Sequence, residues 1–371
     1  MLYREMAKGD KCSLLGFGCM RFPTDSEGKI DRVKSTAMLK AAMESGVNYF
    51  DTAYVYHNGE SELFVGEFLK EYERESFYLA TKLPLWQCET VQRAEEIFAE
   101  QLSKLQTPYI DYLLFHAIDR KLFDKIKNLN LTALAEKWRA EGKVRHIGFS
   151  FHDDYEVFEE MIGYYDWDFC QIQYNYMDTE HQAGLKGLRL AASKNIPVVV
   201  MEPIRGGGLV RFPEDIKNAF SALNPSRNLA NWALSWVATH PEVKVILSGM
   251  STMEQVQDNL NTLGEFVALS EEEMKGVGQI VESIRARKLN VCTGCAYCMP
   301  CPFGVDIPRA FRIANEQAMH GELDHYKAMY NRGKAENFAS VCRACGACES
   351  KCPQHISIIE DLKVVKECFE S

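Results

Sequence analysis

Eight short apolar runs, each followed by a segment with helical periodicity, fill the first 285 of the 371 residues of this chain. Runs such as PVVVME at 197–202 are almost continuously apolar, as expected for parallel strands that are covered on both faces. The predicted strands are 14–20, 47–52, 77–82, 110–116, 144–150, 169–174, 197–202 and 243–248. The helices predicted to follow them are 31–45, 60–73, 90–105, 131–140, 154–164, 184–194, 228–239 and 253–263. Eight such units in ~250 residues predict an α/β fold of the TIM (β/α)8 barrel type.

A second, smaller domain is predicted to follow the barrel. Residues 270–288 begin with Ser and several acidic residues, which is a signal for the start of a helix. This long helix is predicted to lead from a barrel domain at 1–285 into a C-terminal domain at 286–371. Residues 307–320 and 323–331 also show helical periodicity, so the C-terminal domain is predicted to be mainly α-helical.

Two cysteine runs in the C-terminal domain contain eight of the 13 cysteines of the chain. Three thiolates at Cys-x2-Cys-x2-Cys spacing can bind three corners of a 4Fe-4S cluster, and in bacterial ferredoxins a fourth Cys before Pro binds the other cluster. Both runs have this spacing, and each ends in Cys-Pro. The predicted ligand sets are therefore Cys292, Cys295, Cys298 and Cys352 for one cluster, and Cys342, Cys345, Cys348 and Cys301 for the other.

Zinc and disulfides are the alternatives for these cysteines. Secreted disulfide scaffolds do not show this repeated order. The second run has the x3 spacing of bacterial ferredoxins before its last Cys, whereas the first run is one residue shorter. The stretch between Cys301 and Cys342 is longer than a minimal two-cluster ferredoxin needs. The segment resembles the helical dicluster ferredoxin-like modules that are fused to larger oxidoreductases.

Composition argues against several classes of function. A formal net charge of -10 argues against nucleic-acid binding, which needs clustered Lys and Arg. No run of 18 apolar residues exists, so no membrane span is expected. The N-terminal sequence MLYREMAKGDKCS lacks the apolar core of a signal peptide. Oxygen-sensitive clusters and unpaired thiols favour a reducing, cytoplasmic location.

Polar residues at the ends of three successive predicted strands form a recognisable set. In TIM barrels the chemistry takes place where the strands end. Asp51 ends the second strand, and Tyr56 follows it in the same motif, DTAYVY. Lys82 ends the third strand in LATK, and His116 ends the fourth in LLFH. In these motifs the chain resembles the aldo-keto reductases over roughly residues 1–285. The resemblance implies an oxidoreductase that interconverts small-molecule carbonyl compounds and alcohols with NAD(P)H.

Elementary chemistry supports catalytic roles for these four residues. Carbonyl reduction needs a hydride on carbon and a proton on oxygen, and a phenol with a pKa of ~10 is a reluctant acid near pH 7. A neighbouring ammonium lowers that pKa, and a carboxylate holds the ammonium in place. Tyr56 is therefore the predicted general acid and base, with Lys82 adjusting its pKa and Asp51 holding Lys82. His116 is predicted to orient the carbonyl by donating a hydrogen bond.

The resemblance also implies positions that bind the nicotinamide cofactor. The family holds the carboxamide with a Ser-Asn pair after the fifth strand and a Gln in the sixth. Ser150 and Gln171 match this pattern, but Phe151 replaces the Asn. Met201 stands where the family has an aromatic residue that stacks on the ring, and a thioether contacts a ring more weakly. The adenosine end is implied for a segment that offers Gly249, Ser251, Gln255, Asp258 and Asn259.

NADH is mildly favoured over NADPH, because residues 249–259 contain no Lys or Arg to bind a 2'-phosphate. Arg205, in the loop IRGGGL after the seventh strand, is a candidate cation from another direction. These departures from the family pattern leave a flavin as an alternative ligand.

Three functional interpretations follow, because hydride transfer moves two electrons together whereas a 4Fe-4S cluster accepts one at a time. In the first, the clusters exchange electrons with a redox partner such as ferredoxin through a further carrier. In the second, the barrel is an ordinary carbonyl reductase with structural or oxygen-sensing clusters. In the third, the chain is an electron-transfer subunit or redox sensor whose barrel binds a partner, flavin or other ligand without turnover. The intact catalytic set weighs against the third interpretation.

Overall fold

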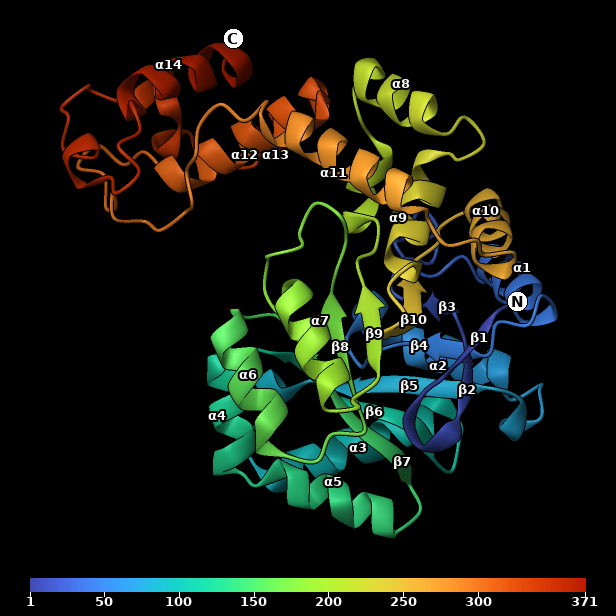
Figure 1. Cartoon of the computed structure of the whole chain (residues 1–371). Helices are drawn as coiled ribbons and strands as arrows, with labels where there is room; N and C mark the ends of the chain where they lie inside the picture. The colour runs from blue at the N-terminus through green and yellow to red at the C-terminus, as the bar shows by residue number, and fades with distance from the viewer. The chain divides into compact units, whose positions relative to one another are not determined.

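The computed structural model describes residues 1–371, which form two compact units (Figure 1). The first unit consists of Met1–Gly206 and Ala230–Ser270, and the second consists of Gly207–Leu229 and Glu271–Ser371. The second unit therefore includes a segment from within the barrel sequence. None of the helices has the length and apolar character that a membrane span requires.

A closed barrel of eight parallel strands forms the centre of the first unit. The strands follow chain order around the barrel, and the last one closes it by pairing with the first. All eight predicted strands occur, so the predicted (β/α)8 fold is confirmed. The strands are β3 (Leu15–Gly18), β4 (Tyr49–Asp51), β5 (Tyr78–Leu83), β6 (Ile110–Ile118), β7 (Val144–Phe151), β8 (Phe169–Gln173), β9 (Val198–Met201) and β10 (Val243–Ser248).

Helices surround the barrel on its outside (Figure 1). Several begin at the side-chain caps that the sequence offers: Asp31 and Thr90 each accept a hydrogen bond at 3.1 Å from a backbone N–H in the first helical turn. Eight of these nine helices match predicted segments. They are α1 (Arg32–Glu44), α2 (Glu60–Leu69), α3 (Val91–Leu105), α4 (Arg120–Asn128), α5 (Leu131–Ala140), α6 (Tyr155–Tyr164), α7 (Gly184–Ser193), α9 (Leu229–Ala238) and α10 (Met253–Gly264).

The N-terminal ends of the barrel strands are covered by a hairpin that was not predicted. Its strands, β1 (Tyr3–Glu5) and β2 (Lys11–Ser13), pair antiparallel. Cys12 of the hairpin belongs to a buried cluster that includes Tyr49 and Phe169, the first residues of β4 and β8. The C-terminal ends of the strands are therefore the end of the barrel that offers polar side chains to a ligand.

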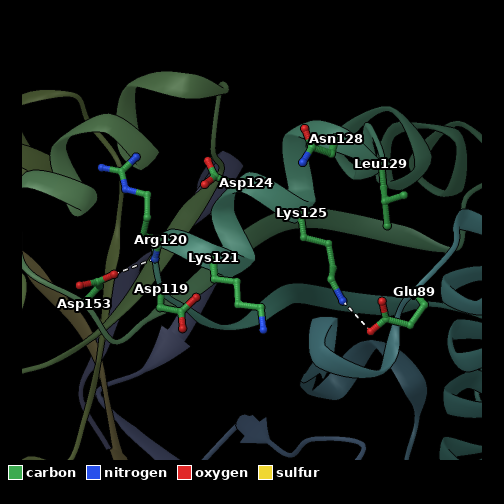
Figure 2. Close-up of a pocket in the computed structure, with 9 residues that line it drawn as sticks. All are labelled: Glu89, Asp119, Arg120, Lys121, Asp124, Lys125, Asn128, Leu129 and Asp153. Atoms are coloured by element: carbon green, nitrogen blue, oxygen red, sulfur yellow. Dashed lines mark hydrogen bonds and ion pairs between the residues drawn. The ribbon is translucent and has the colours of Figure 1, made fainter.

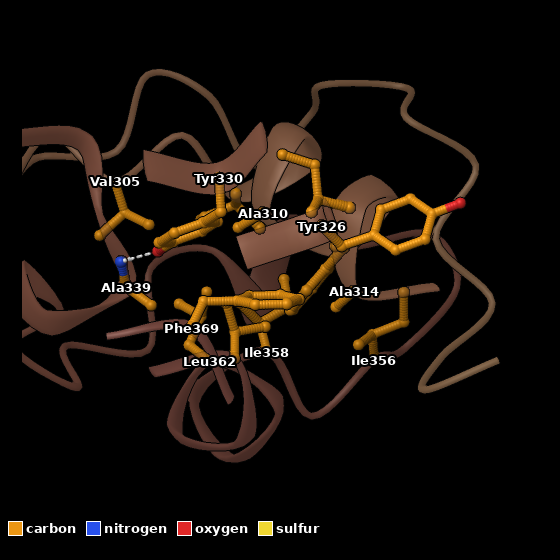
Figure 3. Close-up of a cluster of buried hydrophobic side chains, with 14 residues drawn as sticks. Val305, Ala310, Ala314, Tyr326, Tyr330, Ala339, Ile356, Ile358, Leu362 and Phe369 are labelled. Atoms are coloured by element: carbon orange, nitrogen blue, oxygen red, sulfur yellow. Dashed lines mark hydrogen bonds between the residues drawn. The ribbon is translucent and has the colours of Figure 1, made fainter. Parts of the chain in front are cut away.

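One apolar core of the second unit is formed by residues between Val305 and Phe369 (Figure 3). This core contains Phe311, Ile358 and Phe369, and the Tyr330 hydroxyl accepts a hydrogen bond from the Ala339 N–H at 2.7 Å. The predicted helix at 270–288 is shorter in the structure, and both α8 and α14 were missed. The helices are α8 (Glu214–Leu223), α11 (Glu271–Arg285), α12 (Ile307–His320), α13 (Leu323–Asn331) and α14 (Ile358–Phe369).

Candidate active site and cysteine sites

Three neighbouring strands bring together the four residues that were predicted to be catalytic. Asp51 ends β4, Lys82 lies in β5, His116 lies near the end of β6, and Tyr56 lies in the turn that follows β4. The Lys82 ammonium donates a hydrogen bond to the Asp51 carboxylate, with 2.5 Å between Nζ and Oδ1. The same Nζ lies 4.9 Å from the centroid of the Tyr56 ring. The ring centroids of Tyr56 and His116 are 6.0 Å apart.

Burial and mutual attraction set the charges of the Lys82–Asp51 pair. Burial alone would lower the pKa of Lys82, but Asp51 and Tyr56 outweigh it, so the pKa is raised. Burial raises the pKa of Asp51, and Lys82 opposes that shift. Lys82 is therefore held as an ammonium beside the phenol.

Burial also decides the protonation of Tyr56 and His116. The pKa of Tyr56 is raised by burial, and Lys82 reduces this shift without reversing it. Lys82 thus acts in the predicted direction, but the net pKa lies above the ordinary value, so Tyr56 keeps its proton at neutral pH. Burial, with the charge of Lys82 second, holds the pKa of His116 well below its usual range. His116 is a neutral imidazole, and its buried Nδ1 has no hydrogen-bond partner.

Residues predicted to contact the nicotinamide lie on β7, β8 and β9. Gln171 is buried in β8, and its Oε1 has no hydrogen-bond partner. An amide N–H would satisfy this oxygen, so Gln171 fits a carboxamide ligand. Ser150 is also buried and accepts a hydrogen bond from the Ala117 N–H at 2.8 Å. Met201 is half-buried at the end of β9, and Phe151 is fully buried at the end of β7.

The residues predicted for the adenosine end have different surroundings. Asn259 is buried and donates a hydrogen bond to the Ser248 hydroxyl at 2.7 Å, so its amide supports the end of β10. Gln255 accepts a hydrogen bond from the Ser251 N–H at 2.7 Å, which orders the start of α10. Asp258 lies on the same helix. The Ser251 hydroxyl donates a hydrogen bond to the Arg21 backbone oxygen at 2.7 Å, which joins this loop to the segment after β3.

The predicted cation Arg205 is paired, and a cation that the sequence analysis missed lies nearby. Arg205 Nε lies 3.2 Å from a carboxylate oxygen of Asp178. Arg21 follows β3 and is exposed, and a Cβ atom added to Gly206 would lie 3.0 Å from its guanidinium. A Cβ atom added to Gly249 would also lie 3.0 Å from its aliphatic stem. The strand-end rule that found Asp51 would have found Arg21 if it had been applied to the first strand.

A surface pocket lies beside the start of α4, and its charged residues largely neutralise one another (Figure 2). Lys125 pairs with Glu89 at 3.0 Å, the backbone N–H of Arg120 donates to Asp153 at 2.7 Å, and the Arg120 side chain pairs with Glu160 at 2.6 Å. None of the four predicted catalytic residues lines it. The pocket therefore has no charge pattern that selects a class of ligand.

Eight cysteines of the second unit line two neighbouring pockets. Ile307 lines both pockets, so the two are adjacent. Each pocket combines three cysteines of one run with the last cysteine of the other run. One contains Cys292, Cys295, Cys298 and Cys352, and the other contains Cys342, Cys345, Cys348 and Cys301. No group of three or more His, Cys, Asp or Glu side chains converges on a single metal ion. Each set surrounds a space instead, which fits a cluster with four separate corners.

The two cysteine runs share a backbone pattern. The second residue after the first Cys of each run, Gly294 or Ala344, has φ of 75° or 53°. The residue after the second Cys, Ala296 or Gly346, has φ of 61° or 75°. Left-handed backbone costs a non-glycine residue about 1–2 kcal/mol, so two alanines in this conformation indicate that the loop shape is imposed by its role.

Comparison with known families accounts for both units. Residues 14–282 match the aldo/keto reductase family, which covers most of the chain. The chain belongs to the aldo/keto reductase family. Residues 291–357 match the 4Fe-4S dicluster domain, so this aldo/keto reductase carries a C-terminal dicluster domain. It is an oxidoreductase with cysteine motifs for two clusters.

Relatives of this aldo/keto reductase match between 67% and 76% of the chain. L-galactose dehydrogenase of Arabidopsis thaliana is 27% identical over 303 residues, covering 75% of this chain and 93% of the relative. Methylglyoxal reductase YeaE of Escherichia coli is 29% identical over 254 residues, covering 67% of this chain and 84% of the relative. Among solved structures, the holo form of aldo-keto reductase AKR11C1 from Bacillus halodurans is 27% identical with a TM-score of 0.65. The match covers 76% of this chain and 96% of the AKR11C1 chain.

Proposed function

We propose that this aldo/keto reductase interconverts carbonyl compounds and alcohols with a nicotinamide dinucleotide, with Tyr56 as general acid and base. The observation that carries the proposal is the buried Lys82–Asp51 pair beside the Tyr56 ring, opposite the neutral His116. A buried ion pair alone would suggest a structural role. Here a phenol and an imidazole lie beside the pair, and together they can serve one carbonyl oxygen: the phenol as proton donor and the imidazole as hydrogen-bond donor.

The proposed roles follow from the charge of each group. Tyr56 gives its proton to the carbonyl oxygen in reduction and takes it back in alcohol oxidation. The Lys82 ammonium stabilises the phenolate that remains, and Asp51 holds the ammonium in place. His116, kept neutral by burial, donates an N–H to the carbonyl oxygen and orients it without competing as an acid.

Bound nicotinamide would supply or accept the hydride at the carbonyl carbon. We propose that Ser150 and Gln171 hold its carboxamide and that Met201 contacts its ring. Support comes from the unpartnered Oε1 of Gln171. NADH is the proposed cofactor. The proposed preference of the protein for NADH over NADPH is limited by Arg21, because this cation lies beside Gly249. A flavin is the alternative ligand. The adenosine end is proposed to lie along Gly249, Ser251, Gln255, Asp258 and Asn259.

We also propose that the eight clustered cysteines bind two 4Fe-4S clusters in the crossed arrangement, within a domain at 286–371. Support comes from the two four-cysteine pockets. Bound clusters would carry single electrons. Their proposed partner is a small redox protein such as ferredoxin.

Small carbonyl compounds are the proposed substrates. Because two relatives are named as L-galactose dehydrogenase and methylglyoxal reductase, sugars and 2-oxoaldehydes are the first compounds to test. No more specific substrate follows from the barrel itself.

The test is turnover by the full-length protein, purified without oxygen, and by its Y56F variant. We expect NADH-dependent reduction of at least one small aldehyde, and a kcat lower by roughly 10²–10⁴-fold in Y56F. The affinity for NADH, measured by protein fluorescence, should be unchanged. Equal activity of Y56F would remove Tyr56 from its role. NADH binding without turnover of any aldehyde or alcohol would favour the electron-transfer or sensor interpretation.

A further inference from the structure

Two residues in the first turn of α2 lie directly behind the Lys82–Asp51 pair. Ser61 and Glu62 are both fully buried. The Glu62 carboxylate accepts a hydrogen bond from the Thr81 hydroxyl at 2.6 Å. The same carboxylate oxygen accepts a second hydrogen bond from the Gln101 side-chain amide at 2.7 Å. Glu62 therefore joins α2 to both β5 and α3.

This network holds the peptide of Lys82 itself. The Gln101 amide also lies 3.1 Å from the backbone oxygen of Lys82 and donates to it. Side chains alternate across a strand, so Thr81 faces the helices while Lys82 faces the barrel interior. Glu62 thus fixes the outer face of β5 at the point where Lys82 projects from the inner face.

Ser61 binds Thr52, whose backbone oxygen accepts a hydrogen bond from the same ammonium. Its hydroxyl lies 2.9 Å from the Thr52 hydroxyl and donates to the Cys19 backbone oxygen at 3.0 Å. The Lys82 ammonium donates to the Thr52 backbone oxygen at 2.8 Å. The turn that contains Tyr56 runs directly into α2. One helical turn therefore contacts every segment that places Lys82, Asp51 and Tyr56.

The packing around Glu62 does not by itself require a charged side chain. A buried carboxylate costs more free energy than a neutral amide of the same shape, unless other charges compensate it. Its second oxygen has no hydrogen bond, and Lys104 Nζ lies 4.0 Å from it. Burial raises the pKa of Glu62, and the hydrogen bonds from Thr81 and Gln101, followed by the charges of Lys104 and Lys82, oppose this shift.

We propose that Glu62 is a positioning residue for Lys82: through Thr81 and Gln101 it fixes the strand from which Lys82 reaches Asp51 and Tyr56, and its negative charge helps to keep Lys82 an ammonium. This inference rests on the proposed role of Lys82 in catalysis.

The test compares E62Q with the wild-type full-length protein, both loaded with clusters. E62Q keeps the shape of the side chain and removes its charge. We expect kcat to fall about 10- to 100-fold, because small displacements of catalytic groups have effects of this size. The alkaline limb of the kcat–pH profile should move to lower pH, because Lys82 loses its proton more easily. The affinity for NADH should stay unchanged.

Two further variants separate positioning from stability. T81V removes one hydrogen bond to Glu62 and keeps the charge, so it should lower kcat without moving the alkaline limb. D111N is the control: Asp111 is equally buried and binds the Leu79 N–H of the same strand at 2.9 Å, but at the end away from Lys82. D111N should lower the unfolding temperature and leave kcat unchanged.

The outcomes are distinct. A normal kcat and an unmoved alkaline limb in E62Q would overturn the inference, even if the variant is less stable. If E62Q does not fold, a normal kcat in T81V overturns it. If Y56F keeps full activity, the proposed function itself fails. If Y56F loses activity but E62Q has a normal kcat and an unmoved alkaline limb, only the proposed role of Glu62 fails.

Discussion

Single histidines around the barrel site are kept neutral by burial, and this makes stability depend on pH. Burial lowers the pKa of His57, His116 and His152. The unfolded chain binds a proton at each imidazole below pH about 6.5, and the folded protein does not. Acidification therefore favours the unfolded state. Each such histidine contributes a slope of up to ~1.4 kcal/mol per pH unit below its ordinary pKa.

We predict that H116Q reduces this acid sensitivity. Its free energy of unfolding should fall less steeply than that of the wild type between pH about 6.5 and 5, because one proton fewer is taken up on unfolding. Urea unfolding followed by tryptophan fluorescence measures this, since all five tryptophans lie in the first unit. H325Q, at an exposed position of α13, is the control and should keep the wild-type slope. Parallel slopes for H116Q and the wild type would contradict the prediction.

The catalytic set could be predicted from sequence because strand ends of a barrel meet on one face. Asp51, Lys82 and His116 each end a recognisable apolar run, so topology alone places them together. Glu62 gave no such signal. It stands in a helical segment, where an acidic residue is normally exposed, and only the packing of α2 against β5 shows that it is buried. The net direction of the Tyr56 pKa shift could not be predicted from sequence either. It depends on how far the effect of burial on this pKa exceeds the opposing effect of the Lys82 charge.

Two of the elements that were not predicted from sequence, α4 and the β1–β2 hairpin, are short. The nine residues of α4 contain only three buried apolar side chains, Leu122, Phe123 and Ile126, among charged ones. The β1–β2 hairpin has three-residue strands, too short for alternation to be visible. The Asp119 cap at the start of α4 was the one available signal, and its side chain accepts a hydrogen bond from the Leu122 N–H at 2.7 Å.

The two cysteine loops make a prediction at the level of elements. If the last Cys of each run serves the other loop, C352S should lose the cluster of the first run and C301S that of the second. Each variant should then contain about half the wild-type iron, and the EPR spectrum of each reduced variant should show a different remaining cluster. C368S is the control, because Cys368 packs on the same core but lines neither pocket. Loss of the second-run cluster in C352S would mean that each run binds its own cluster.

At the scale of the whole molecule, the reactions proposed for the two units involve different numbers of electrons. Carbonyl reduction moves a hydride, which carries two electrons, and each cluster accepts one. Two clusters together have the capacity for the electrons of one hydride, but hydride transfer cannot deliver them singly. If the barrel and the clusters exchange electrons, the exchange needs a carrier that accepts two electrons and releases them one by one, and a flavin is the common carrier with this property.

We therefore predict that NADH alone leaves the clusters oxidised, and that NADH with added free flavin reduces them. The measurement is the visible absorbance of the anaerobic protein during titration with NADH, with EPR of frozen samples at each step. Dithionite, which delivers single electrons, is the positive control for cluster reduction. In Y56F the flavin-dependent reduction should persist if it bypasses the proton donor, whereas aldehyde reduction should be lost. Bleaching by NADH without added flavin would mean that the protein already contains a carrier, and the purified protein would then be analysed for bound flavin.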